Sequence, residues 1–354
     1  MACIHRRRLL SGISPKPETA RGETRSLSLI VLSLLLWGSS AGGQTLESTV
    51  KPQNDNLARI SGATLLVGYP SDLWLTRGTD TMHVEGNGCR DESWLPSISA
   101  DGHILAVVRT ENCGTGRIPV TLDTQKPGAQ GIPHGNLKFD RGEISVSPDG
   151  SKLVCSRHNQ GSSWNLQILD LRTGEVSLGP EMRDDPGREI SWSPDGHRFA
   201  FETHFWADRG VPAFRNVYAI YIFDIEARST TQIGVGHSPS WSPSGDLIAF
   251  VGYVPQEKRQ TSAWCDAGRC YEPGADTVSV MKADGTQTRT LMTFRSYIHG
   301  VAPVWSPDSQ TLLVNKSRNA EDDSYDIYVL DLATGKRRRI CKNTMPVYAW
   351  VQAH

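Results

Sequence analysis

The sequence lacks an excess of charge of either sign, because 37 Lys and Arg residues stand against 38 Asp and Glu residues. A surface dominated by positive charge is therefore not expected at the level of the whole chain, and we expect no nucleic-acid partner. The chain also lacks the composition of collagen, a coiled coil or a disordered protein, since 33 Gly and 20 Pro are spread among apolar segments and 10 Trp. A turn-rich globular protein remains.

No apolar run is long enough to span a bilayer. The longest, residues 27–37, would reach about 16 Å as a helix against about 30 Å of hydrocarbon, so we expect no permanent membrane span. It follows a basic stretch and precedes small residues around Ala41, the order of a secretory signal. We therefore expect a signal peptide and leader in residues 1–43, a linker in residues 44–60, and a periplasmic or secreted protein. An uncleaved amino-terminal anchor is the alternative.

One phrase recurs through the rest of the chain, in the form Ser-x-Ser-Pro-Asp-Gly or a close variant. Its second serine is Ser99, Ser147, Ser193, Ser242 and Ser306, at steps of 48, 46, 49 and 64 residues. A short apolar run follows each copy, which predicts a hairpin turned at Asp-Gly between two strands. Because the turn recurs, its aspartates, Asp101, Asp149, Asp195 and Asp308, are interpreted as turn residues and not as catalytic acids.

Two further strands complete each repeat, and four antiparallel strands about every 48 residues indicate an all-β fold, a β-propeller. The chain ends on a first strand without partners, residues 345–349, whereas residues 64–67, 72–76 and 82–84 are second, third and fourth strands without a first. Pairing of the C-terminal strand with the N-terminal blade would close a six-bladed ring over residues 61–354. Closure removes the exposed sheet edges of an open solenoid.

The Pro-x-Trp-Ser-Pro-Asp-Gly phrase resembles the WD40-like (PD40) repeat of TolB-like six-bladed propellers, over residues 61–354. The resemblance implies a periplasmic, non-enzymatic scaffold that binds protein partners. The chain departs from TolB in leaving only about 17 residues between Gly43 and the first strand, too few for TolB's amino-terminal α/β domain.

Six of the seven cysteines lie outside the predicted leader. Cys265 with Cys270, and Cys89 with Cys113, are candidate disulfides in loops of the face opposite the Asp-Gly turns. The Cys-x4-Cys spacing without a following His does not favour zinc, so we expect no metal or other cofactor. The remaining two are interpreted as buried thiols in strands.

The longest irregular segment, residues 252–276, falls between the second and third strands of one blade. It carries Tyr253, Trp264, Arg269 and Tyr271, the residue types that dominate binding energy at protein interfaces. We predict a recognition element; a loop that packs only on its own blade is the alternative.

The channel mouth on the same face should be ringed by residues at the start of the first strands. Glu143 and Glu189 occupy equivalent positions there, and His237 and His299 lie at the mouth of later blades. The two glutamates suit a cation site or an acid/base pair, but solvated or ion-paired rim carboxylates are the simpler interpretation.

The sequence thus predicts an exported, non-catalytic binding module with a protein partner. A glycan is the second ligand class. A hydrolase or lactonase with a metal at the channel mouth is the enzymatic alternative, although residues 61–354 contain no Gly-x-Ser-x-Gly nucleophile motif; the nearest approach, residues 236–240, lacks the final glycine.

Overall fold

The computed structural model describes residues 64–69, 72–77, 80–86, 95–110, 117–126, 130–137, 139, 144–158, 163–182, 186–206, 216–255, 264–266, 269–271, 274–294, 301–319 and 322–351. The chain divides into residues 1–49 and 50–354, and every described residue belongs to the second unit. The predicted leader and linker lie outside the described part. Within these ranges, no helix combines the length and the apolar character needed to cross a bilayer.

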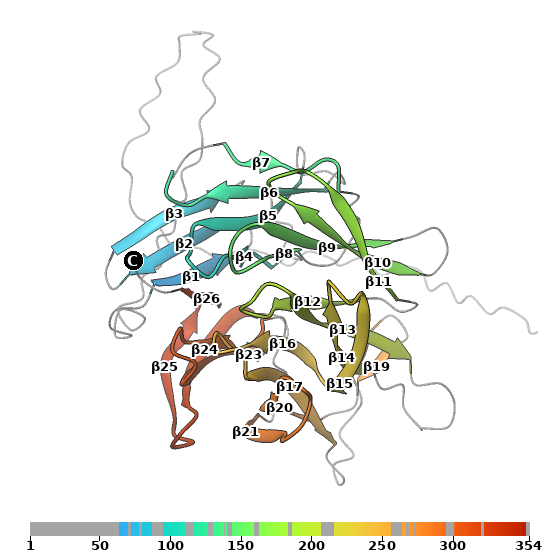
Figure 1. The fold of residues 1–354 in the computed structure, drawn as a ribbon. Helices are drawn as coiled ribbons and strands as arrows, with labels where there is room; N and C mark the ends of the chain where they lie inside the picture. Colours follow the sequence, from blue (N-terminus) through green and yellow to red (C-terminus); the bar gives the residue numbers. More distant parts are fainter. Residues whose placement is uncertain are drawn as a thin grey trace, which may run out of the picture. The chain divides into compact units, whose positions relative to one another are not determined.

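The described strands form six four-stranded antiparallel sheets, the blades of a propeller (Figure 1). Blades 1 to 3 contain, from the first to the fourth strand, β26 (Val347–Val351), β1 (Thr64–Tyr69), β2 (Asp72–Arg77) and β3 (Asp80–Gly86); β4 (Ser97–Ile98), β5 (Ile104–Thr110), β6 (Arg117–Asp123) and β7 (Ile132–Pro133); and β8 (Ile144–Val146), β9 (Lys152–His158), β10 (Trp164–Asp170) and β11 (Val176–Met182).

Blades 4 to 6 contain β12 (Pro186–Trp192), β13 (Arg198–Trp206), β14 (Asn216–Asp224) and β15 (Ser229–Val235); β16 (His237–Trp241), β17 (Leu247–Pro255), β20 (Gly274–Lys282) and β21 (Arg289–Phe294); and β22 (Val304–Trp305), β23 (Thr311–Asn319), β24 (Asp322–Asp331) and β25 (Arg337–Thr344). A separate two-stranded hairpin, β18 (Trp264–Asp266) and β19 (Arg269–Tyr271), is inserted between β17 and β20. This insertion accounts for the step of 64 residues in the repeat.

The ring is closed by the two ends of the propeller, as the sequence predicted. The C-terminal strand β26 pairs antiparallel with β1, with Leu66 opposite Ala349 and Thr64 opposite Val351. Figure 1 shows the two strands side by side in blade 1, in the colours of opposite ends of the chain. The strand order β26-β1-β2-β3 therefore completes the sixth sheet.

The hydrophobic core is divided among the six boundaries between neighbouring blades. Six buried clusters are present, and each draws its residues from two adjacent blades, including blades 6 and 1, where Leu313 and Ile327 meet Leu65 and Val347. Because burial of apolar area stabilises at about 25 cal/mol per Å², each blade depends on both neighbours for its stability. Pairing of β26 with β1 thus keeps two buried clusters away from water: the one between blades 6 and 1 and the one between blades 1 and 2.

The serine and tryptophan of the repeated phrase connect neighbouring inner strands. The Trp192 indole N–H donates to the Ser145 carbonyl at 3.2 Å, and that of Trp305 donates to the Ser240 carbonyl at 2.9 Å. A serine hydroxyl supplies a second link where Ser191 accepts from the backbone N–H of Trp241 at 2.8 Å. Residues of the repeated phrase thus satisfy polar groups across the boundaries between blades 3 and 4, 4 and 5, and 5 and 6.

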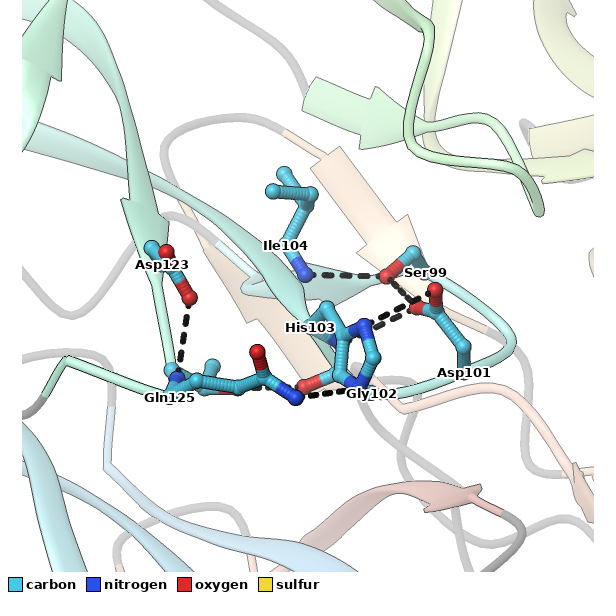
Figure 2. Close-up of polar contacts among 8 residues, drawn as sticks. Ser99, Asp101, Gly102, His103, Ile104, Asp123 and Gln125 are labelled. Atoms are coloured by element: carbon cyan, nitrogen blue, oxygen red, sulfur yellow. Dashed lines mark hydrogen bonds and ion pairs between the residues drawn. The ribbon is translucent and has the colours of Figure 1, made fainter. Parts of the chain in front are cut away.

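The Asp-Gly turns cap the hairpins, as predicted (Figure 2). The Ser99 hydroxyl donates to Asp101 at 2.5 Å and accepts from the Ile104 N–H at 2.9 Å, while the Asp101 carboxylate accepts from the His103 N–H at 3.0 Å. Gly102 has φ +76°, a conformation that a side chain disfavours.

The same turn shifts the titration of its carboxylate in blade 3. Partial burial would raise the pKa of Asp149, but hydrogen bonds from the hydroxyls of Ser147 and Ser151 and from the Ser151 N–H lower that pKa to about 2. The turn aspartates therefore act as ionised caps, consistent with a structural role.

Candidate functional site

The hairpin insertion, Glu189 and His237 belong to the upper face, defined as the side opposite the Ser-Pro-Asp-Gly turns. Second strands end there, and third strands begin. In five blades, the chain passes from second to third strand through residues 70–71, 111–116, 159–163, 207–215 or 320–321, whereas blade 5 uses residues 256–273. Among the described residues, blade 5 alone carries additional strands in this connection.

The structure gathers three of the four predicted recognition residues into the β18–β19 hairpin. Trp264 lies opposite Tyr271, and Arg269 lies opposite Asp266. Tyr253 lies in β17, opposite Asp276 of β20, below the insertion. The sequence predicted an irregular loop here, but the segment contains a paired hairpin; only the backbone of these four predicted residues is described, so their binding role stays a prediction.

Cys265 and Cys270 lie directly opposite one another in this hairpin. A two-residue connection, Ala267 and Gly268, joins the strands. The predicted partners Cys89 and Cys113 lie outside the described residues, so that pairing is not placed.

The predicted buried thiols are confirmed. Cys155 and Cys341 are free and buried, and burial raises the pKa of the former to about 12 and of the latter to about 11. Thiolates are the reactive form of cysteine, so neither residue suits nucleophilic chemistry at neutral pH.

Glu189 is not a solvated rim carboxylate, because only 6% of the residue is exposed. It precedes Ile190, which pairs with Phe201, whereas Glu202 follows Phe201 along β13. The register shifts between Pro186 and Ile190, so Glu189 lies in the irregular stretch of β12 that faces the Phe201–Thr203 segment of β13, which contains Glu202. Glu202 is also buried, with 4% exposed.

Glu202 connects blade 4 to blade 5, a role that the sequence analysis missed. Its carboxylate accepts a hydrogen bond from the backbone N–H of Ser238 in β16. Ser238 has φ +54°, in the left-handed region that non-glycine residues disfavour. The buried acceptor thus holds the start of β16 in an uncommon conformation.

Asn315 occupies the corresponding place in β23 of blade 6 and makes the same kind of link. Its amide donates to the Val347 carbonyl and accepts from the Val347 N–H, both at 2.8 Å. The signal that could have identified both residues is a polar side chain at the end of a second-strand apolar run. This shared geometry favours a structural role for Glu202 over a catalytic one.

His237 begins β16 and is half-buried. Its Nδ1 lies 2.9 Å from the Ser238 hydroxyl, and its ring centroid lies 5.4 Å from that of Tyr218. The structure therefore brings His237 and Glu202 to the same residue, Ser238, on the upper face. Glu143 and His299, the other two predicted mouth residues, lie outside the described part of the chain.

The described residues include no group of three or more His, Cys, Asp and Glu side chains able to hold a metal ion. On the upper face, the buried Glu202 links blade 4 to the start of β16, where the half-buried His237 lies, and blade 5 carries the inserted hairpin. Rigid positioning of this kind suits recognition by loops on a preformed scaffold.

The fold defined by these features is the closed six-bladed β-propeller. Solved structures with this arrangement include TolB from Acinetobacter baumannii, with a TM-score of 0.56 and 18% identity over 82% of this chain and 66% of that one. The putative TolB from Agrobacterium tumefaciens follows with a TM-score of 0.50 and 17% identity over 72% of this chain and 82% of that one. The chain is therefore a TolB-like β-propeller in its fold, and it spans slightly less than two thirds of the A. baumannii protein.

The same fold also occurs in an enzyme. An oligogalacturonate lyase in complex with manganese has a TM-score of 0.53 and 16% identity, over 77% of this chain and 70% of that one. No protein-family model matches the sequence, and no curated protein matches it. At these identities the likeness establishes the fold, which hosts both binding proteins and enzymes.

Proposed function

We propose that this chain is an exported, non-catalytic binding module that recognises a protein partner in the bacterial envelope through the upper face of blade 5. The observation that carries the proposal is the β18–β19 hairpin, inserted into one blade of an otherwise regular ring. A fold needs a connection in every blade, but a binding element is needed once. Trp264, Arg269 and Tyr271 in that hairpin are residue types enriched at interface hot spots.

We further propose a disulfide between Cys265 and Cys270 that rigidifies this hairpin. Directly opposite residues in an antiparallel pair have Cα atoms about 4.5 to 5.5 Å apart. Disulfides span Cα separations of about 4.4 to 6.8 Å, so the register supports the bond. An oxidising compartment, expected from the signal-like amino terminus, would maintain it. Trypsin cleaves after Arg269, between the two cysteines, so a mass spectrum of the unreduced digest tests it: residues 260–269 and 270–282 joined in one species that separates on reduction would support the bond.

The test of function replaces the insertion without disturbing blade 5. Pro255 pairs with Gly274 at the ends of β17 and β20, so a two-residue Asn-Gly turn can substitute for residues 256–273. The full chain and this variant are used as baits in envelope extracts, with a Trp264→Ala/Tyr271→Ala variant and an Ile132→Ala control. Ile132 is 64% exposed on blade 2, so its truncation removes apolar surface far along the chain from the hairpin.

The proposal expects a saturable protein partner that binds the full chain and the Ile132→Ala control. It also expects loss of that partner on replacement of the hairpin and at least tenfold weaker binding by the double aromatic variant, since a hot-spot residue contributes about 2 kcal/mol or more. Equal capture by the full chain and the hairpin replacement would reject the upper-face site. A saturable glycan ligand with no protein partner would reject protein recognition.

A further inference from the structure

Blade 6 ends in a fourth strand whose charge has no counterpart in the other blades. β25, shown in red at the outside of its sheet in Figure 1, has the sequence RRRICKNT and contains four Lys or Arg residues. The fourth strands of blades 1 to 4 contain none, and that of blade 5 contains one, Arg289. Lys336 extends the basic run into the preceding turn.

These cations are concentrated although the whole chain has a formal net charge of -1. Arg337, Arg338 and Arg339 are all exposed. Successive residues of a strand point to opposite sides of the sheet, so the exposed charge lies on both sides of this edge. Arg339 is paired with Asp326 at 3.1 Å. Neither Arg337 nor Arg338 has an ion-pair partner within the described part of the chain.

The cationic part of β25 is also its regular part. Leu330, Val329 and Tyr328 of β24 lie opposite Arg337, Arg338 and Arg339, and the register shifts only beyond them. β25 is last in the strand order of blade 6, so its outer backbone groups face away from β24. A regular sheet edge of this kind can accept an additional strand through backbone hydrogen bonds.

Lys and Arg on a sheet edge commonly prevent edge-to-edge association of identical chains. That role alone would be expected at each exposed fourth strand, yet the basic run occurs in one blade. The same charges that repel a second copy attract a strand of opposite charge, because electrostatic complementarity selects partners and orients them. A flat anionic surface would contact the arginines on only one side of the β25 edge. An added strand would place its own side chains on both sides of the sheet and so could contact the arginines on both.

We propose that the β25 edge is a second protein-binding site, which takes an extended acidic peptide segment as a fifth strand of blade 6. Carboxylates at successive positions of the added strand face Arg337 on one side and Arg338 on the other. This site does not depend on the upper-face function proposed above, because it lies at the outer edge of another blade.

The probe is a fluorescent ten-residue peptide, Glu-Glu-Thr-Thr-Glu-Glu-Thr-Thr-Glu-Glu, which places carboxylates on both sides of an added strand. Its binding to the full chain is measured by anisotropy at about 50 mM salt, where surface charges act over about 14 Å. A variant, Arg337→Gln/Arg338→Gln, is compared with Lys126→Gln/Arg172→Gln, which removes the same charge from blades 2 and 3. The Arg339 ion pair is left intact in both. Circular dichroism and the urea midpoint verify that both variants fold.

The proposal expects at least about fivefold weaker binding by the Arg337→Gln/Arg338→Gln variant and less than twofold change in the control, since each exposed pair contributes up to about 1 kcal/mol. A peptide with the same glutamates but with proline in place of each threonine should not bind, because proline removes strand hydrogen bonds. Amide exchange of β25 should slow on binding.

Three results would overturn this inference: no binding of the acidic peptide, equal binding by both double variants, or equal binding of the proline peptide or of sodium polyphosphate. Equal binding of the proline peptide or of polyphosphate would identify a surface that binds polyanions in general, without strand addition. Replacement of the β18–β19 hairpin should leave peptide binding unchanged, so failure of either proposal is recognised separately.

Discussion

Asn315→Ala should weaken the closure of the ring, at the boundary between blade 6 and the C-terminal strand β26 of blade 1. Asn315 is 1% exposed, and its amide satisfies both backbone polar groups of Val347 at 2.8 Å. Truncation leaves a buried N–H and a buried C=O without that partner, and each unsatisfied group costs about 1 to 3 kcal/mol. We therefore expect a loss of about 2 to 4 kcal/mol in the free energy of unfolding.

The matched control is Asn136→Ala. Asn136 is exposed, and its amide donates one hydrogen bond, to the Gly174 carbonyl at 3.1 Å, so water can replace the lost partner. We expect this substitution to cost less than about 1 kcal/mol.

Equilibrium urea unfolding, followed by tryptophan fluorescence, measures these differences from the midpoint at a constant slope. Limited proteolysis provides a second readout, because a detached β26 exposes the C-terminus before the remaining blades unfold. An Asn315→Ala midpoint equal to that of Asn136→Ala would refute the reasoning. It would show that apolar packing between blades 6 and 1 closes the ring without the amide.

Three further outcomes follow from the contacts of single residues. Trp305→Phe removes the 2.9 Å bond to the Ser240 carbonyl between blades 6 and 5, and calorimetry should show a loss of about 1 kcal/mol or more. The pKa of Asp149 is lower in the folded chain, about 2, than the usual 3.8, so its stabilisation is present above pH 3.8 and is lost as the pH falls through about 2; in acid titrations of stability, Asp149→Asn should flatten the curve in that window, and an unchanged curve would contradict the capping role. Cys155 and Cys341 should resist a thiol reagent at pH 8 in the native protein and react after denaturation, because burial raises both pKa values; rapid native labelling at either position would contradict the burial.

The sequence repeat was sufficient to predict the blades because the same short-range pattern of turn and strand residues specifies each blade. The Asp-Gly turn, the apolar second strand and the alternating third strand recur in the sequence, and each is specified by neighbouring residues. The short first strands were also visible, since the Trp-Ser pair marks them. β18 and β19 were not predicted as strands, because three-residue segments between turns carry too little pattern to distinguish a hairpin from a loop.

The candidate site was less predictable because its residues act across blade boundaries. Glu189 was expected to be a solvated or ion-paired rim carboxylate, and the structure places it in a buried position with 6% exposed. Glu202 was overlooked, since nothing in its own strand shows that the Ser238 N–H of the next blade requires an acceptor. Sequence spacing identifies which residues share a strand. It does not show which backbone groups of another blade they reach.

The sequence by itself therefore determined the all-β class, the number of blades and the way the ends join, because each follows from a repeated local pattern and from counting unpaired strands. Only the tertiary structure decided which polar side chains connect the blades and which stay exposed. The physical reason is that burial and hydrogen-bond satisfaction depend on neighbours distant in sequence. Asn315 links blade 6 to Val347 of blade 1, and the arginines of β25 lie at an edge because β25 is last in the strand order of its sheet, while the next strand of the chain, β26, joins blade 1.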